Sequence, residues 1–159
     1  MNSQKQIRLK RYTAEFNEKL GEFELPAEQE QFTAMPIEML EVTEERHPIV
    51  ILSDWEPVGF FVLHSSERVK EYSDNPKAML LTALSINYAQ QGKGYANKGM
   101  SLLRDFITQE FPNCNEVVLA VNHKNIPAQK LYEKVGFTDT YRRKIGRIGE
   151  QYIYSLTLG

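Results

Sequence analysis

The segment from residue 77 to residue 110 constrains the fold more than any other part of the chain. Residues 77–87 contain two apolar triplets, Met79-Leu80-Leu81 and Leu84-Ser85-Ile86, as expected of a buried strand. A turn with two glycines follows at residues 90–94. The apolar residues of 95–110 then recur at steps of four, three and four, which is typical of one buried helical face. A strand that turns directly into an amphipathic helix indicates an α/β fold.

The rest of the chain predicts the other elements. We expect a strand at residues 7–12 and a helix that begins after Thr13 and ends near Gly21. Pro26 and Pro36 punctuate residues 25–39, so we expect a short helix between irregular segments there. Two strands at 49–54 and 58–64, separated by Glu56-Pro57, form a hairpin, and 65–76 is a polar connection. A strand at 116–121, a helix from Asn125 to Val135 ended by Gly136, and strands at 137–143 and 151–158 joined through Gly146 and Gly149 complete the order. This order predicts a mixed α/β sheet of about seven strands flanked by about four helices, in a single domain spanning residues 1–159.

Composition excludes several classes of protein. Hydrophobic residues make up 42% of the chain and charged residues 25%, which is ordinary globular usage. The apolar runs are strand-sized, well short of the roughly 20 residues of a membrane-spanning helix. Residues 1–11 are polar and basic, so we expect no secretory signal and a cytoplasmic location. Cys114 is the single cysteine, expected to be a small, partly buried residue rather than a nucleophile, and no metal site is expected.

Charge is unevenly distributed along the chain. Residues 13–46 hold ten Glu against Lys19 and Arg46, whereas residues 91–147 hold ten Lys or Arg against five acidic residues. The basic second half suits an anionic ligand, although surface charge often serves solubility alone. The net charge of -2, and basic residues that do not alternate with an aromatic platform, argue against a nucleic-acid partner.

The turn Gln90-Gln91-Gly92-Lys93-Gly94-Tyr95-Ala96 is a candidate anion site. Glycine lets main-chain amides approach a ligand closely, and the first amides of a helix lack an intrahelical acceptor and lie at the positive end of its dipole. A phosphate or diphosphate is therefore the expected occupant. Two other nucleotide motifs do not fit, because Met100 stands where a phosphate-binding loop needs lysine and the glycines lack the dinucleotide-binding spacing.

A second informative segment runs from Asn122 to Phe137. Ala128, Leu131 and Val135 share one helical face, which places Tyr132 at the edge of that face. The Tyr132 hydroxyl can then point into a cleft, while the plainer alternative is a core tyrosine with an incidental hydrogen bond.

Together the two segments resemble the GNAT N-acetyltransferase superfamily. The family's signature after its fourth strand is Gln or Arg, two residues, Gly, one residue, then Gly or Ala, and it is matched by Gln91, Gly94 and Ala96. Its later segment is matched by Asn125, Leu131-Tyr132 and Gly136-Phe137. Residues 87–90 depart from the family pattern because they lack its frequent proline and acidic residue. Gln91 replaces the frequent arginine, which leaves Lys93 as the nearby cation for phosphate.

The resemblance implies an enzyme that moves an acetyl group from acetyl-CoA to a primary amine by direct attack. The cofactor-binding residues it implies are Leu84, Ser85 and Ile86 for the pantetheine arm, Gln91, Gly92, Lys93, Gly94, Tyr95 and Ala96 for the diphosphate, and Asn122 and Asn125 on the other side. A main-chain amide near Ile86 would stabilise the oxyanion. Tyr132 would be the general acid that protonates the departing thiolate.

The acceptor and the general base stay open at this stage. Glu22, Glu56 and His64 are all candidates for the base. The glutamate-rich first third favours a cationic small molecule, polyamine-like or lysine-like. The alternatives are a protein amine, or a regulatory module that binds acyl-CoA without catalysis. We expect a monomer or homodimer with no membrane partner.

Overall fold

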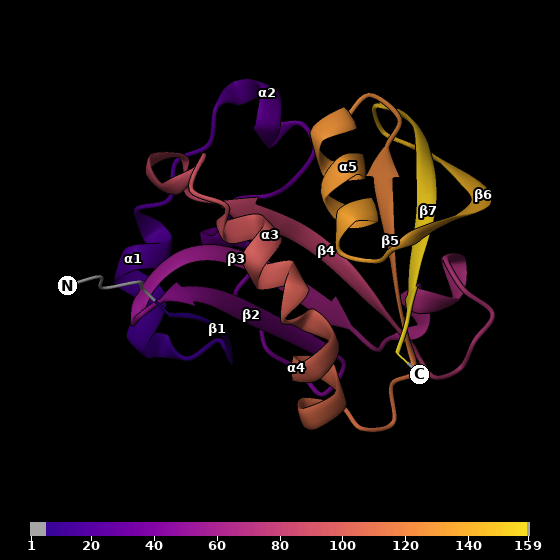
Figure 1. Cartoon of the computed structure of the whole chain (residues 1–159), viewed down its shortest axis with the longest axis horizontal. Coiled ribbons are helices and arrows are strands. Elements are labelled where there is room, and N and C mark those ends of the chain that lie inside the picture. The colour runs from indigo at the N-terminus through magenta and orange to yellow at the C-terminus, as the bar shows by residue number, and fades with distance from the viewer. Residues whose placement is uncertain (1–5, 159) are drawn as a thin grey trace.

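Figure 1 shows a computed structural model that describes residues 6–158. Residues 1–5 and residue 159 lie outside the described residues. Residues 1–5 include part of the segment 1–11 from which the absence of a secretory signal was predicted. Within 6–158 the seven strands are β1 (Ile7–Arg11), β2 (Arg46–Ser53), β3 (Glu56–His64), β4 (Ala78–Ile86), β5 (Glu116–Asn122), β6 (Thr138–Gly146) and β7 (Gly149–Thr157). The five α-helices of the same range are α1 (Asn17–Gly21), α2 (Ala27–Glu30), α3 (Tyr95–Ser101), α4 (Leu103–Glu110) and α5 (Ile126–Lys134).

The strands form one mixed sheet in the order β1-β2-β3-β4-β5-β7-β6, in which only β4 and β5 run parallel. Its two faces are covered by different helices (Figure 1). One face packs against α3, α4 and α5 through Met100, Leu103, Ile107 and Tyr132. The other packs against α1 and the turn before it through Phe16 and Leu20. The predicted mixed α/β sheet of seven strands is therefore confirmed.

The sheet splits at its centre. β4 and β5 pair only through Ala78–Leu80 and Glu116–Val118, so the remainder of each strand has no partner on that side. Ala83 adopts a left-handed backbone with φ 60°, which costs about 1–2 kcal/mol for a residue that has a Cβ atom. The register between β3 and β4 also shifts near this point. The split leaves main-chain groups of β4 facing an opening in the sheet.

Some predicted boundaries were wrong. The helix predicted at 95–110 is interrupted at Leu102, where the Leu102 amide donates to the Gly99 carbonyl at 3.1 Å, an i−3 bond in place of the α-helical i−4 bond. The first hairpin turns at Asp54-Trp55, since Asp54 tolerates a φ of 55° there, and Glu56 and Pro57 already belong to β3. Five α-helices stand where about four were predicted, and the predicted polar connection contains the 3₁₀ turn Glu67–Glu71, a kind of short segment that carries weak periodicity.

Other local predictions are confirmed. The Asn125 side chain accepts a hydrogen bond from the Ala128 amide at 3.3 Å and caps α5, and Gly136 follows that helix with φ 109°. Cys114 is half-buried, its thiol donates to the Glu116 carbonyl at 3.2 Å, and burial raises its pKa, as expected of an unreactive thiol. None of the helices described between residues 6 and 158 has the length and apolar character needed to cross a membrane.

Candidate active site

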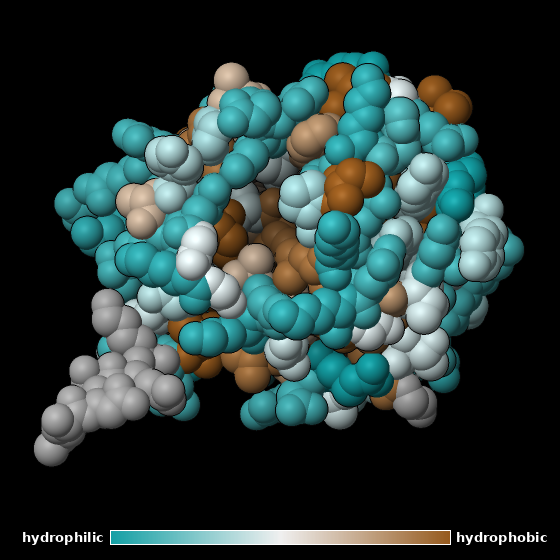
Figure 2. Space-filling view, turned by 45° about the horizontal axis from the view of Figure 1, so that its top comes forward, coloured by the Kyte–Doolittle hydropathy of each residue, from teal (hydrophilic) through white to brown (hydrophobic). Residues whose placement is uncertain are grey.

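The opening between β4 and β5 continues into a cleft of about 1190 Å³. Its walls come from residues 81–86 of β4, residues 119–122 of β5, the turn before α3, the first turns of α5 and the segment around α2. Figure 2 shows this hollow, which is apolar in its depth and ringed by hydrophilic side chains. Pockets for drug-sized ligands measure about 300–1000 Å³, so this cleft is larger than is usual for one such ligand.

Main-chain groups of β4 point into this cleft. The Asn87 amide donates to the Val58 carbonyl on β3 at 3.0 Å. Because main-chain groups alternate in direction along an antiparallel strand, those of the preceding residue, Ile86, face away from β3 and toward the opening. The Ile86 carbonyl there accepts a hydrogen bond from the Gln91 side chain at 2.9 Å. The Ile86 amide is therefore directed at the space where a ligand of the cleft would lie.

The turn before α3 presents a series of main-chain donors. Gly92 and Gly94 have φ values of 80° and 81°, a conformation that favours glycine. Among the residues that the structure describes, no acceptor takes a hydrogen bond from the amides of residues 92–97. The Gln91 amide, by contrast, donates to the Tyr88 carbonyl at 3.1 Å. The stretch of donors thus begins one residue later than the sequence predicted, at Gly92.

The Gln91 side chain is occupied by structural hydrogen bonds. Its Nε2 donates to Gln29 Oε1 at 2.8 Å, and its Oε1 accepts from Gln29 Nε2 at 3.1 Å. Lys93 does not line the cleft, and its ammonium group donates to Gln90 Oε1 at 3.1 Å. Of the basic side chains in the described range, those that line the cleft are Lys124 and Arg147.

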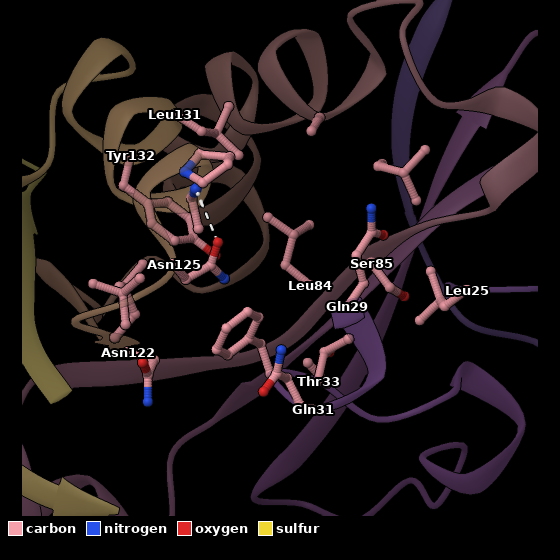
Figure 3. Close-up of a pocket in the computed structure, with 18 of the residues that line it drawn as sticks. Leu25, Gln29, Gln31, Thr33, Leu84, Ser85, Asn122, Asn125, Leu131 and Tyr132 are labelled. Carbon is pink, nitrogen blue, oxygen red and sulfur yellow. Dashed lines mark hydrogen bonds between the residues drawn. The ribbon is translucent and has the colours of Figure 1, made fainter. Parts of the chain in front are cut away.

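Tyr132 reaches the cleft from α5 (Figure 3). Its ring is only 7% exposed and packs edge-on against Phe137, with 5.5 Å between the ring centroids. Burial raises the pKa of the Tyr132 hydroxyl, so the group keeps its proton at neutral pH. Asn122 lines the same region, where its Oδ1 accepts from the Lys124 amide at 2.9 Å.

The three residues considered as a general base do not line the cleft. Glu22 is exposed and pairs with Lys19 at 3.7 Å, and Glu56 begins β3 directly after the turn of the first hairpin. His64 is buried, with its Nε2 2.7 Å from the Thr82 hydroxyl, and burial together with Arg68 lowers its pKa to about 4. Among the described residues, the carboxylate that does line the cleft is Glu28.

Comparison with known proteins identifies the family. The sequence model of the acetyltransferase (GNAT) family matches residues 9–137. The chain belongs to the GNAT family. Over 151 residues it is 48% identical to the uncharacterized N-acetyltransferase YbbJ of Bacillus subtilis (strain 168), covering 92% of this chain and 94% of that protein. The chain is therefore a GNAT-family N-acetyltransferase.

Solved structures share the fold of this GNAT protein. Aminoglycoside acetyltransferase AAC(6')-Ib in complex with coenzyme A and kanamycin superposes with a TM-score of 0.72 at 19% identity, covering 96% of this chain and 95% of that chain. A spermidine N-acetyltransferase SpeG chimera, from Vibrio cholerae and hSSAT, has a TM-score of 0.70 at 17% identity, covering 98% and 96%. At these identities the likeness establishes the fold.

Most of the residues predicted for the GNAT site lie together. The cleft brings together Leu84, Ser85, Ile86, Gln91, Gly92, Gly94, Tyr95, Ala96, Asn122, Asn125 and Tyr132. Lys93 stays outside the lining. Sequence reasoning missed the wall around α2, which includes Glu28, Gln29 and Thr33. Glu28 is one of ten glutamates between residues 13 and 46, so composition alone could not single it out.

Proposed function

We propose that this GNAT-family N-acetyltransferase binds acetyl-CoA in the cleft between β4 and β5 and transfers its acetyl group to a primary amine of a small cationic molecule. The observation that carries the proposal is the run of amides at residues 92–97, which have no acceptor among the described residues and lie beside the split in the sheet. Such amides at the start of a helix are suited to a diphosphate. The coenzyme A named in the AAC(6')-Ib structure supports this choice of ligand.

The cleft matches the chemistry of the coenzyme along its length. A pantetheine arm carries amide groups that can pair with an open strand edge, and residues 84–86 of β4 offer such an edge because β5 has diverged from it. The diphosphate then lies against the amides of residues 92–97. Lys124 and Arg147, which line the cleft from the β5 and β7 side, supply positive charge for the phosphate groups.

The proposed reaction is a direct transfer. The lone pair of the amine nitrogen attacks the thioester carbonyl carbon, and the Ile86 amide donates a hydrogen bond to the oxyanion, a contact worth about 3–4 kcal/mol in other acyl transfers. The carbon–sulfur bond then breaks, and Tyr132 gives its proton to the sulfur. The nitrogen loses one proton to water at the acceptor end of the cleft, and water returns a proton to Tyr132. One amide and one thiol result.

Two features support a cationic amine as the acceptor. The wall around α2 belongs to the glutamate-rich first third of the chain, and Glu28 lines the cleft from that wall. Two proteins of the same fold are named for acceptors that carry amines, spermidine and the aminoglycosides. A carboxylate at the entrance would attract such cations.

Thiol release from acetyl-CoA across a panel of amines tests the proposal, together with mass spectrometry of the product. We expect turnover with small cationic amines and a product that has gained one acetyl group. Calorimetry with coenzyme A provides the companion measurement. Tight binding of coenzyme A without turnover of any amine would indicate a module that binds the coenzyme without catalysis. No binding of coenzyme A would contradict the assignment of the cleft as the acetyl-CoA site.

A further inference from the structure

The segment around α2 forms a fixed wall opposite the end of β4. The Glu24 amide donates to Asn87 Oδ1 at 2.9 Å, and the Tyr88 amide donates to the Glu24 carbonyl at 2.8 Å. Farther along, the reciprocal amide pair of Gln29 and Gln91 ties α2 to the turn that precedes α3. Because the wall is attached at both places, the side chains it directs into the cleft are held in position before an acceptor arrives.

Two hydroxyl groups lie in this part of the cleft without a partner. Ser85 is only 5% exposed, and neither its Oγ nor the buried Oγ1 of Thr33 makes a hydrogen bond within the described chain. Leu84 and Ile86 pack against the cluster beneath α3, so Ser85, which alternates with them along β4, directs its side chain to the opposite face, which α1 covers. Buried hydroxyls are nearly always hydrogen-bonded, so these two are suited to a polar group of a ligand. Figure 3 shows Ser85 near Gln29 and Leu25, and Thr33 near Gln31.

Charge is divided between the two sides of the cleft. Glu28, the one carboxylate that lines it among the described residues, lies on the α2 side. Lys124 follows β5 and Arg147 precedes β7, and these strands lie to the right of α2 in Figure 1. Leu25 and Phe32 flank α2 in the lining and offer apolar surface for methylene groups. The α2 side therefore combines a carboxylate, apolar walls and two free hydroxyls.

We propose that the acceptor is an aliphatic molecule with two amino groups, which Ser85 and Glu28 recognise. The Ser85 hydroxyl, on the strand that would hold the thioester, accepts a hydrogen bond from the amine that is acetylated. The Glu28 carboxylate binds the second group, which stays an ammonium ion. This inference rests on the proposed acetyl transfer and adds to it the residues that select the acceptor: Glu28 determines specificity, and Ser85 positions the nitrogen.

The first test measures specificity with cadaverine and pentylamine, which have the same carbon chain and differ by one amino group. In Glu28→Gln the ratio of kcat/KM for cadaverine to that for pentylamine should fall about 2- to 5-fold, the size expected of an exposed charge pair. Added NaCl should lower the same ratio in the wild type and leave it unchanged in the variant. Glu30→Gln is the matched control, because Glu30 is an exposed residue of the same helix that does not line the cleft.

The second test concerns Ser85. Ser85→Ala should lower kcat/KM about 3- to 10-fold for both amines, the loss expected for one uncharged hydrogen bond, with the acetyl-CoA KM unchanged because the main chain of β4 is intact. Ser85→Thr, which keeps the hydroxyl, should retain more activity than Ser85→Ala.

The outcomes separate the two proposals. Equal ratios in Glu28→Gln and Glu30→Gln would overturn the role of Glu28 while leaving acetyl transfer in place. Full activity of Ser85→Ala would overturn the role of Ser85. Failure of the wild type to acetylate any amine would overturn the proposed function itself, and the inference with it.

Discussion

Replacing Tyr132 with Phe removes one oxygen atom from the reaction site and little else. The ring packs against Phe137 with 5.5 Å between centroids, and phenylalanine preserves that contact. Burial alone raises the pKa of the Tyr132 hydroxyl, with no contribution from a hydrogen bond to another described residue, so the free energy of unfolding should change by less than about 1 kcal/mol. A general acid contributes at least about 100-fold to a rate, or about 2.7 kcal/mol in activation free energy. We therefore expect kcat to fall about 100-fold in a variant that is as stable as the wild type.

The assay follows thiol release at saturating acetyl-CoA, with coenzyme binding measured by calorimetry and stability by thermal unfolding. Coenzyme affinity should stay within about twofold of the wild type, because the lost hydroxyl acts only on the leaving sulfur. Tyr154→Phe is the matched control, since Tyr154 is also buried but hydrogen-bonds to Glu133 at 2.6 Å and does not line the cleft. Unchanged kcat in the Tyr132 variant would refute its role as the acid, whatever the control shows.

Three further perturbations test other parts of the account. Gly94→Val forces a β-branched residue into a φ of 81° and directs its side chain into open space, so calorimetry should show coenzyme A affinity reduced by about tenfold or more. Gln91→Leu removes the hydrogen bonds to Gln29 and Ile86, so hydrogen exchange should become faster in the segment around α2, and the acceptor KM should rise. Because burial lowers the pKa of His64 from 6.5 to about 4, the unfolded state takes up a proton between these values, and the free energy of unfolding should fall by up to about 3 kcal/mol as pH decreases through this window. Urea unfolding of His64→Asn near pH 7 and near pH 4 should show a smaller decrease, and an equal decrease would remove His64 as its source.

The sequence predicted the sheet well because strand and helix periodicity are local signals. Apolar runs marked β2, β3, β4 and β5, and the cap at Asn125 placed the start of α5 correctly. The first hairpin turn was misplaced because Pro57 is usually read as a strand breaker. It is accommodated here beside a register shift, opposite Leu52. The interruption at Leu102, where an i−3 hydrogen bond replaces the α-helical one, is a detail that periodicity does not encode.

The candidate site was predicted in part for a similar reason. The site residues in the turn before α3 and in α5 belong to the two sequence motifs themselves, so most of them were predicted, including Tyr132. The wall around α2 was not predicted, because Glu28 and Thr33 approach β4 only through tertiary contacts such as the Gln29–Gln91 pair. Lys93 was expected to line the site from its position in the motif, and its side chain instead turns toward Gln90. The direction of a surface side chain is set by neighbours that the motif does not specify.

Amide chemical shifts give the most direct test of where the coenzyme binds. The labelled protein would be titrated separately with coenzyme A and with pantetheine, which lacks the diphosphate. Coenzyme A should shift the amide resonances of residues 84–86 and 92–97 together, whereas pantetheine should shift those of β4 and leave residues 92–97 unchanged. If coenzyme A left residues 92–97 unperturbed while binding elsewhere, the assignment of this turn as the diphosphate site would be contradicted.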